Sequence, residues 1–62
     1  MEKWIGEAVA KMHLYKIKQE EVARRVGVRR EHINKILSGN IRPKNAEQRI
    51  MSAINQIINE RG

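Results

Sequence analysis

The chain has 62 residues, a net charge of +6, no cysteine and no aspartate. A chain of this length has room for one small core, and without cysteine it can form neither disulfides nor thiolate metal sites. The same composition excludes cysteine-based catalysis and leaves glutamate as the only acid, so we expect no enzymatic activity, no metal and no cofactor.

The first predicted element is a helix over residues 2–14. Apolar side chains recur there every three or four positions, which is the spacing of one helix face, and no part of the chain alternates as a strand would. A break follows around residues 14–18, where Tyr15 and Ile17 are expected to enter the core. The residues expected on the inner face of the helix are Ile5, Ala8, Val9 and Met12.

Two short helices are predicted next, over residues 19–26 and 30–37. Gly27 ends the first of them, because glycine readily takes the left-handed conformation that follows a helix, and Gly39 stops the second. The residues expected to face inward are Val22, Ala23, Val26, Ile33, Ile36 and Leu37.

The last predicted helix covers residues 46–60. A loop at residues 40–43 precedes it, since the proline there disfavours helix for the residue before it. Asn45, followed three residues later by Gln48, is typical of a capping box, in which side chains satisfy free backbone N–H groups. The apolar positions of this helix are Ile50, Ala53, Ile54, Ile57 and Ile58. The predicted fold is therefore all-α, a single domain over residues 1–62 built as a compact bundle of four helices, or five.

The positive charge is concentrated in the middle of the chain. Residues 16–44 contain nine lysines and arginines against three glutamates, whereas the flanks hold four of each sign and cancel. Localised basic charge favours a polyanionic partner, most often nucleic acid. On charge alone, the solvated surface of a basic protein is the alternative reading.

The two short helices and their turn meet the geometric demands of a helix-turn-helix. The helices cross steeply, so a small residue is needed at the crossing, and Ala23 stands there. The turn needs a residue that tolerates positive φ, Gly27, and an apolar residue to hold it to the core, Val28. Ile33 and Ile36 seat the second helix, whose opposite face stays free to enter a DNA major groove.

The segment QEEVARRVGVRREHINKILSG, residues 19–39, resembles the helix-turn-helix of phage Cro and repressor DNA-binding domains, the xenobiotic-response-element family. A proline soon after the last glycine, here Pro43, is also typical of that family. The resemblance implies a lambda-repressor-like DNA-binding domain, with the helix-turn-helix proper at residues 19–38 and double-stranded DNA as the partner. The positions that carry the resemblance are Gln19, Val22, Ala23, Gly27, Ile33, Ile36 and Gly39.

The resemblance also implies which side chains contact DNA. Arginine suits guanine N7 and O6, lysine reads guanine more weakly, and glutamate accepts from cytosine N4, whereas phosphate contacts carry no sequence information. For His32 a plain solvated position is equally open, and Arg24 and Arg25 are more often plain surface charge than phosphate partners. The residues expected to contact bases are Arg29, Arg30, Glu31 and Lys35. The residues expected to contact phosphates are Gln19, His32, Asn34, Ser38, Arg42 and Lys44.

Two features depart from the family pattern. Arg29 stands where the family usually has Ser or Thr as the N-cap of the second short helix. Arginine cannot accept from the free N–H groups there, and its charge opposes the helix dipole, so a bound phosphate would relieve both problems. His13 and Leu37 stand where many members pair an arginine with a glutamate. Because both partners are replaced, we expect no lone buried charge and interpret His13 as structural rather than as a metal ligand.

The last helix is more apolar than one core-facing stripe requires, which predicts a homodimer. Family members often bind two-fold operators as dimers, with recognition helices about 34 Å apart. A Trp4 that simply caps the core is an equally open interpretation. The candidate interface residues are Trp4, Met51, Ile54 and Ile58.

The sequence therefore predicts a sequence-specific double-stranded DNA-binding transcription regulator, most similar to a small Cro or repressor protein. The alternative is a protein-binding module, antitoxin- or adaptor-like, that acts through the apolar C-terminal helix. No apolar run approaches the roughly 20 residues that span a bilayer, and no signal-peptide pattern is present, so no membrane association is expected. We expect a location in the prokaryotic cytoplasm or nucleoid, or in the host cytoplasm for a phage-encoded protein, and no small-molecule ligand.

Overall fold

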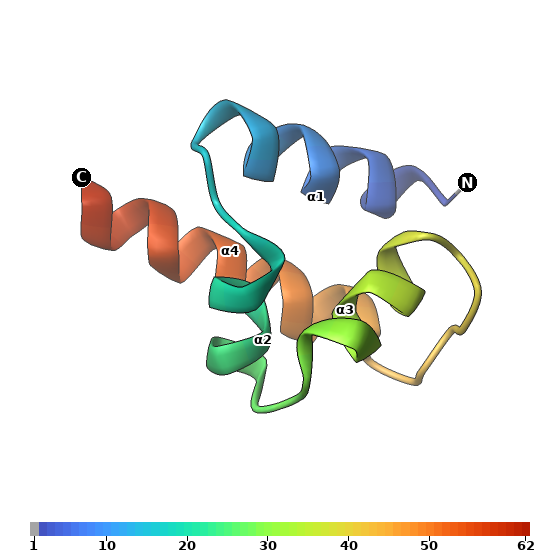
Figure 1. Cartoon of the computed structure of the whole chain (residues 1–62). Coiled ribbons are helices and arrows are strands. Elements are labelled where there is room, and N and C mark those ends of the chain that lie inside the picture. The colour runs from blue at the N-terminus through green and yellow to red at the C-terminus, as the bar shows by residue number, and fades with distance from the viewer. Residues whose placement is uncertain (1) are drawn as a thin grey trace.

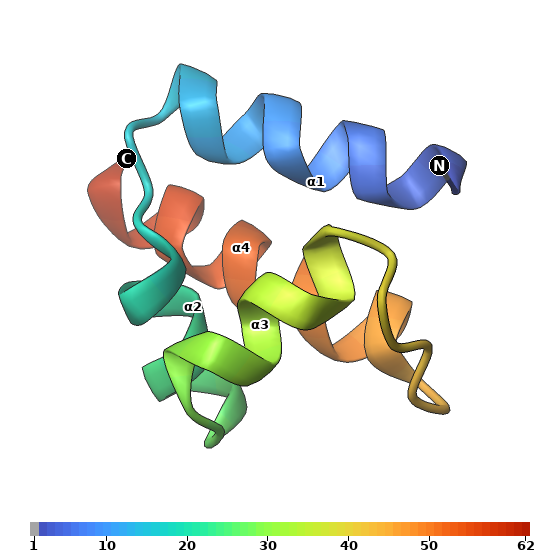
Figure 2. The same cartoon turned by 45° about the vertical axis from the view of Figure 1, so that its right-hand side comes forward.

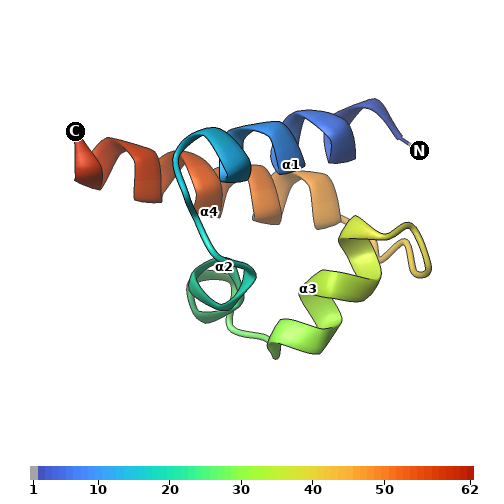
Figure 3. The ribbon, with the colours of Figure 1, turned by 45° about the horizontal axis from the view of Figure 1, so that its top comes forward.

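The computed structural model describes residues 2–62, which form four α-helices and no strand. α1 and α4 pack against each other and run in the same direction, while α2 packs on both α3 and α4 (Figure 1, Figure 3). The prediction of an all-α bundle is confirmed, and each helix end lies within one residue of its predicted position. The helices are α1 (Lys3–Leu14), α2 (Gln19–Val26), α3 (Arg30–Leu37) and α4 (Ala46–Arg61).

The hydrophobic core lies where the four helices meet. Its largest fully buried side chains, each with less than 2% of its surface exposed, are Val22, Ile33, Ile50 and Ile54. Burying an aliphatic side chain of this size contributes about 1.5–3 kcal/mol by removing apolar surface from water. Ile5, Ala8 and Met12 of α1, with Ile17 after it, complete the core. The core thus fixes α3 by one face and leaves the other face of that helix free.

Val9, expected on the inner face of α1, is 44% exposed. The buried residues of α1 are Ile5, Ala8 and Met12, which repeat every three to four positions. Val9 comes one position after Ala8, about 100° further around the helix. Its side chain therefore stands at the edge of the buried stripe, and the prediction for this residue is wrong.

Tyr15, expected to enter the core with Ile17, is 43% exposed. It is the C-cap of α1, and the next residue, Lys16, has a left-handed backbone with φ 56°. The chain turns sharply there, and the backbone N–H of Ile17 donates back to the Met12 carbonyl at 2.8 Å. Ile17 is 5% exposed, so only the second half of the prediction holds.

Ile54, predicted at a dimer interface, is 0% exposed. A side chain that is fully covered by its own core cannot contact a partner's surface, so the prediction is wrong for this residue. Most of the apolar stripe on α4 serves the core instead, as the burial of Ile50 shows. The other three candidates, Trp4, Met51 and Ile58, are half-buried and pack against the core from its edge.

The start of α4 differs from the expected capping box. Asn45 is its N-cap, but the backbone is left-handed with φ 66°, and its side chain makes no capping hydrogen bond. A capping side chain reaches the first turn from an extended backbone, which a left-handed residue does not provide. The first turn is held by the backbone, because the Ala46 N–H donates to the Pro43 carbonyl and the Arg49 N–H to the Asn45 carbonyl.

Two arginines tie the end of α4 to α2. Arg61 donates to both carboxylate oxygens of Glu21, at 2.9 and 2.8 Å, and to the carbonyls of Tyr15 and Lys16. Arg25 forms an ion pair with Glu60. Glu21 lies in the first turn of α2 and Arg25 in its last turn. The contacts with α4 therefore fix both ends of α2, the first helix of the helix-turn-helix.

The Glu21 carboxylate should make the fold sensitive to acid. The backbone N–H of Lys18, at 3.2 Å, and the Arg61 guanidinium hold the pKa of Glu21 below its ordinary value of 4.5. A carboxylate with a lowered pKa in the folded state stabilises the fold fully above its unfolded pKa, and this contribution is lost as pH falls through the folded pKa. We expect Glu21→Gln to be less stable than the parent at neutral pH and to lose less stability below pH 4.5, measured by thermal unfolding across pH.

The matched control for this experiment is Glu20→Gln. Glu20 stands next to Glu21 but meets only Arg24, at 3.9 Å, and both side chains are largely exposed. Exposed pairs of this kind contribute little. Equal loss of stability in the two variants would contradict the role given to Glu21.

Candidate nucleic-acid interface

The turn between α2 and α3 is built as the sequence predicts. Gly27 is left-handed with φ 89°, and the backbone N–H groups of Gly27 and Val28 both donate to the Ala23 carbonyl, at 2.8 and 3.0 Å. Beyond Gly27 and its two chain neighbours, no atom lies within 4 Å of the position that a Cβ on Gly27 would take, so glycine is needed there for its backbone angle rather than for space. Arg49 of α4 donates to the Val26 carbonyl at 2.9 Å and closes the end of α2.

α3 presents a charged face to solvent. Its inner side is formed by Ile33, Ile36 and Leu37, all of them buried. At 3.6 residues per turn, its exposed residues fall within an arc of about 140° on the opposite side. These exposed residues are Arg30, Glu31, Asn34, Lys35 and Ser38, the last at the C-cap. A continuous exposed face of this width is what a helix needs to lie in a groove with its back on the core.

Five residues of the turn and of α3 gather around one cleft. It is lined by Val28 and by the side chains of Arg29, Glu31, His32 and Lys35. Three of the four predicted base-contacting residues thus border a common cleft that extends from the start of α3 to its last turn, and Arg30 lies on the exposed face of the helix. His32 is half-buried and sits at the edge of this face, between the cleft and the loop that follows α3.

Arg29 is the N-cap of α3, and its extended backbone (φ −79°, ψ 153°) is that of an ordinary N-cap. Its side chain makes no capping hydrogen bond. The free N–H groups of the first turn and the positive charge of Arg29 both attract an anion at this end of the helix. Arginine at this position is poor for helix stability and suited to binding phosphate.

Replacing Arg29 with serine should separate stability from DNA binding. A serine hydroxyl at the N-cap accepts from the first turn, and good caps add about 1 kcal/mol, which raises Tm by about 4–8 °C for a domain of this size. The same change should weaken DNA binding because it removes a cation. Arg29→Ala is the control, since it removes the cation without supplying a cap. Thermal unfolding and a DNA titration of both variants test this, and a serine variant that binds DNA as tightly as the parent would remove Arg29 from the interface.

The loop after α3 folds back on the helix end. The Lys35 carbonyl accepts from the N–H groups of Asn40, at 2.9 Å, and Ile41, at 3.3 Å, and from the Ser38 hydroxyl, at 3.1 Å. Lys44 and His32 line one small cavity, so this part of the loop lies beside α3. The Ser38 hydroxyl proton is already used inside the protein, and a phosphate contact by Ser38 would have to compete with that bond.

Gln19, the expected phosphate contact of α2, lines a different cleft from Arg29 and Glu31. It is half-buried and lines a cleft with Leu37, at the other end of α3. Lys16 and Lys18 line the same cleft as Gln19. Both lysines belong to the basic segment but are not among the predicted contacts, although Lys18 directly precedes Gln19 and Lys16 lies three residues before it.

Ion pairs divide the cations of residues 16–44 into those with a carboxylate partner and those without one. Arg24 pairs with Glu20 and Arg25 with Glu60, so the charges of this helix end are met within the protein. This favours the reading of both arginines as surface charge. Arg42 pairs with Glu2 at 3.2 Å. Within residues 2–62, the cations of this segment that have no carboxylate partner are Lys16, Lys18, Arg29, Arg30, Lys35 and Lys44.

His13 and Leu37 occupy one cleft without forming a polar contact to each other. Leu37 is 6% exposed, and His13 is exposed on α1. No buried polar atom is left without a partner in the described part of the chain. The loss of the charged pair found in many relatives therefore leaves no unsatisfied group.

Among the helices of residues 2–62, none combines the length and apolar character required to cross a bilayer. The same residues contain no cluster of three or more histidine or glutamate side chains placed to hold a metal ion.

A family profile described as helix-turn-helix matches residues 10–48, which is more than half of the chain. The matched part begins within α1, includes all of α2, the turn and α3, and ends in the first turn of α4. Comparisons with curated proteins and with solved structures gave no significant match. The profile and the helix-turn-helix geometry agree, and the chain belongs to the xenobiotic-response-element family of helix-turn-helix DNA-binding domains.

Proposed function

We propose that the protein is a small Cro- or repressor-like transcription regulator that reads double-stranded DNA by placing α3 in the major groove. The observation that carries this proposal is the exposed face of α3, with Arg29, Arg30 and Lys35 around it, none of which has a carboxylate partner within residues 2–62. A groove in DNA is lined by phosphates and by base acceptors, and both suit such a face. Residues 1–62 would act as a single domain, in the prokaryotic cytoplasm or in the cytoplasm of a phage host.

The position of each side chain relative to α3 supports the kind of DNA contact proposed for it. Arg30, Glu31 and Lys35 lie on the exposed face of α3, where they would meet base edges, and Arg29 would bind a base or a phosphate at the helix start. Arginine with glutamate suits a site that contains G·C pairs. The phosphate contacts would come from Asn34 and Ser38 on the exposed face of α3, from His32 at its edge, from Gln19 of α2, and from Arg42 and Lys44 in the loop after α3.

A homodimer on a two-fold operator is part of the proposal. Two copies with their recognition helices about 34 Å apart would meet successive turns of the major groove. Met51 and Ile58 of α4 and Trp4 of α1 are half-buried and leave apolar surface for such a contact. Because Ile54 is buried, the interface would be formed by the rim of α4 and not by the centre of its apolar stripe.

Selection of binding sites from random duplex DNA, repeated at two salt concentrations, tests the proposal. We expect an enriched palindromic sequence whose affinity falls as salt rises, since phosphate contacts release counterions. Salt-dependent binding without an enriched sequence would contradict sequence-specific readout. Enrichment of a single half-site without its inverted copy would contradict the dimer while leaving the readout by α3 intact.

A protein-binding module acting through α4 is the alternative from the sequence. The burial of Ile54 removes the central residue of the surface on which that reading depends. The substitution that separates the two readings is Met51→Glu or Ile58→Glu, because both side chains reach the surface. If these variants lose function while Arg30→Ala keeps it, the protein-binding reading replaces the DNA-binding one.

A further inference from the structure

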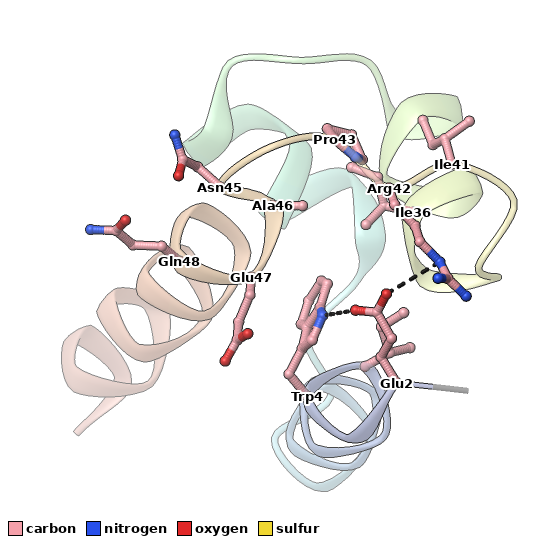
Figure 4. Close-up of a pocket in the computed structure, with 11 residues that line it drawn as sticks. Glu2, Trp4, Ile36, Ile41, Arg42, Pro43, Asn45, Ala46, Glu47 and Gln48 are labelled. Carbon is pink, nitrogen blue, oxygen red and sulfur yellow. Dashed lines mark hydrogen bonds and ion pairs between the residues drawn. The ribbon is translucent and has the colours of Figure 1, made fainter.

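The loop after α3 is joined to the start of α1 by three side chains. Arg42 Nε lies 3.2 Å from Glu2 Oε1, and Trp4 Nε1–H donates to Glu2 Oε2 at 2.5 Å (Figure 4). The two carboxylate oxygens of Glu2 thus have one partner each. Figure 1 and Figure 2 show the start of α1 beside this loop, although the two segments are about 40 residues apart in the chain.

Two sets of contacts hold Glu2 in place, one at its backbone and one at its side chain. Its backbone carbonyl accepts from the N–H groups of Ile5, at 3.1 Å, and Gly6, at 3.3 Å, as the N-cap of α1. The Trp4 ring packs against the core and fixes the other end of the side chain. A carboxylate anchored in this way is a rigid support for the guanidinium that it meets.

Arg42 uses only one edge of its guanidinium in this contact. The group carries five N–H donors, of which the Nε donor faces Glu2 and the four on the two terminal nitrogens remain. The side chain is 75% exposed, and Figure 4 shows its terminal nitrogens on the side away from the Trp4 ring. Two parallel N–H groups on these nitrogens match the oxygens of a phosphate. Pairing with Glu2 and binding of phosphate are therefore compatible.

We propose that Glu2, fixed by Trp4, is a positioning residue that orients Arg42 for a bidentate contact to a DNA phosphate at the end of α3. This rests on the proposed function, because it requires that the protein binds duplex DNA. A free arginine loses rotamer freedom when it binds, and an arginine already ordered by Glu2 loses less. The cost is the repulsion between the Glu2 carboxylate and the phosphate, which water and salt screen at an exposed site. Because the loop is hydrogen-bonded to the Lys35 carbonyl, the ordered Arg42 also has a fixed place relative to α3.

The test compares Glu2→Gln in two backgrounds, by titration of the selected duplex. The parent chain is measured first. If it binds no duplex, the proposed function is overturned, and the role proposed for Glu2 is overturned as well. With Arg42 present, we expect Glu2→Gln to weaken binding by up to about fivefold, which is the upper end of the effect measured for exposed ion pairs. Glutamine still accepts from Trp4 but offers no charge to Arg42. With Arg42→Lys, the same change should leave binding unchanged or strengthen it, because a lysine has no second edge for the phosphate.

Glu47→Gln is the matched control. Glu47 lines the same cleft as Glu2 and Arg42 but forms no ion pair within residues 2–62. Its removal takes away the same negative charge without disturbing Arg42, so DNA binding should be unchanged or slightly tighter. Circular dichroism at the temperature of the titration would check that each variant is folded. Binding by Glu2→Gln that equals or exceeds that of the parent would overturn the proposal, as would an equal loss in the parent and Arg42→Lys backgrounds.

Discussion

Replacing Ile54 with alanine should lower the free energy of unfolding by about 2–5 kcal/mol. Ile54 is 0% exposed at the centre of the core, so the change removes three buried carbon atoms and leaves a cavity that the four short helices must close. A domain of 62 residues has a total stability of only about 3–9 kcal/mol. The variant should therefore be partly unfolded at 37 °C, and urea unfolding followed by circular dichroism measures the loss.

Ile58→Ala is the control for this result. It makes the same substitution one turn further along α4, where the side chain is only half-buried at the edge of the core. The gain in helix propensity is shared by the two variants, so their difference reports burial alone. A loss in Ile58→Ala as large as that in Ile54→Ala would mean that Ile58 is covered by a second copy of the chain, and unfolding at several protein concentrations would then show it.

The helices could be predicted from sequence because periodicity, glycine and proline all mark the same boundaries. Gly27 and Gly39 stand directly after the apolar repeats of α2 and α3, and both have positive φ. Two of the errors fall where one residue has a left-handed backbone, whereas Val9 and Ile54 lie in correctly predicted helices but differ from expectation in their burial. The left-handed Lys16 follows the exposed Tyr15, and the left-handed Asn45 replaces a capping box. Lysine rarely takes this conformation, and asparagine takes it more often but is also a common N-cap, so the residue type alone does not decide the outcome.

The candidate site could be predicted in part, for a physical reason. The exposed face of α3 is the complement of its buried face, so the positions of Arg30 and Lys35 follow from local spacing. The environment of Arg42 does not follow, because its partner Glu2 comes from the other end of the chain. The burial of Ile54 could not be predicted either, because a wide apolar stripe on a helix is compatible with a core and with an interface. The packing of α1 and α2 on α4 decides between the two.

Replacing Arg30 with alanine should weaken binding to the selected operator by about 5- to 150-fold and relax the preference at one base pair. This corresponds to about 1–3 kcal/mol, the discrimination supplied by one bidentate contact to guanine. Arg30 is the first residue of α3, is exposed and has no carboxylate partner within residues 2–62, so its side chain is free to take this role. Titration of the operator and of single-base variants of it provides the measurement.

Lys44→Ala is the control that distinguishes a base contact by Arg30 from a phosphate contact. Lys44 lies in the loop beside α3 and is also an exposed cation without a carboxylate partner in residues 2–62, so the two variants lose the same charge. A phosphate contact should weaken all sequences alike and reduce the salt slope by about 1, without changing which base is preferred. If Arg30→Ala weakens the operator and unrelated duplexes equally, Arg30 contacts the backbone. The reading of bases would then rest on Glu31 and Lys35, which share the exposed face of α3.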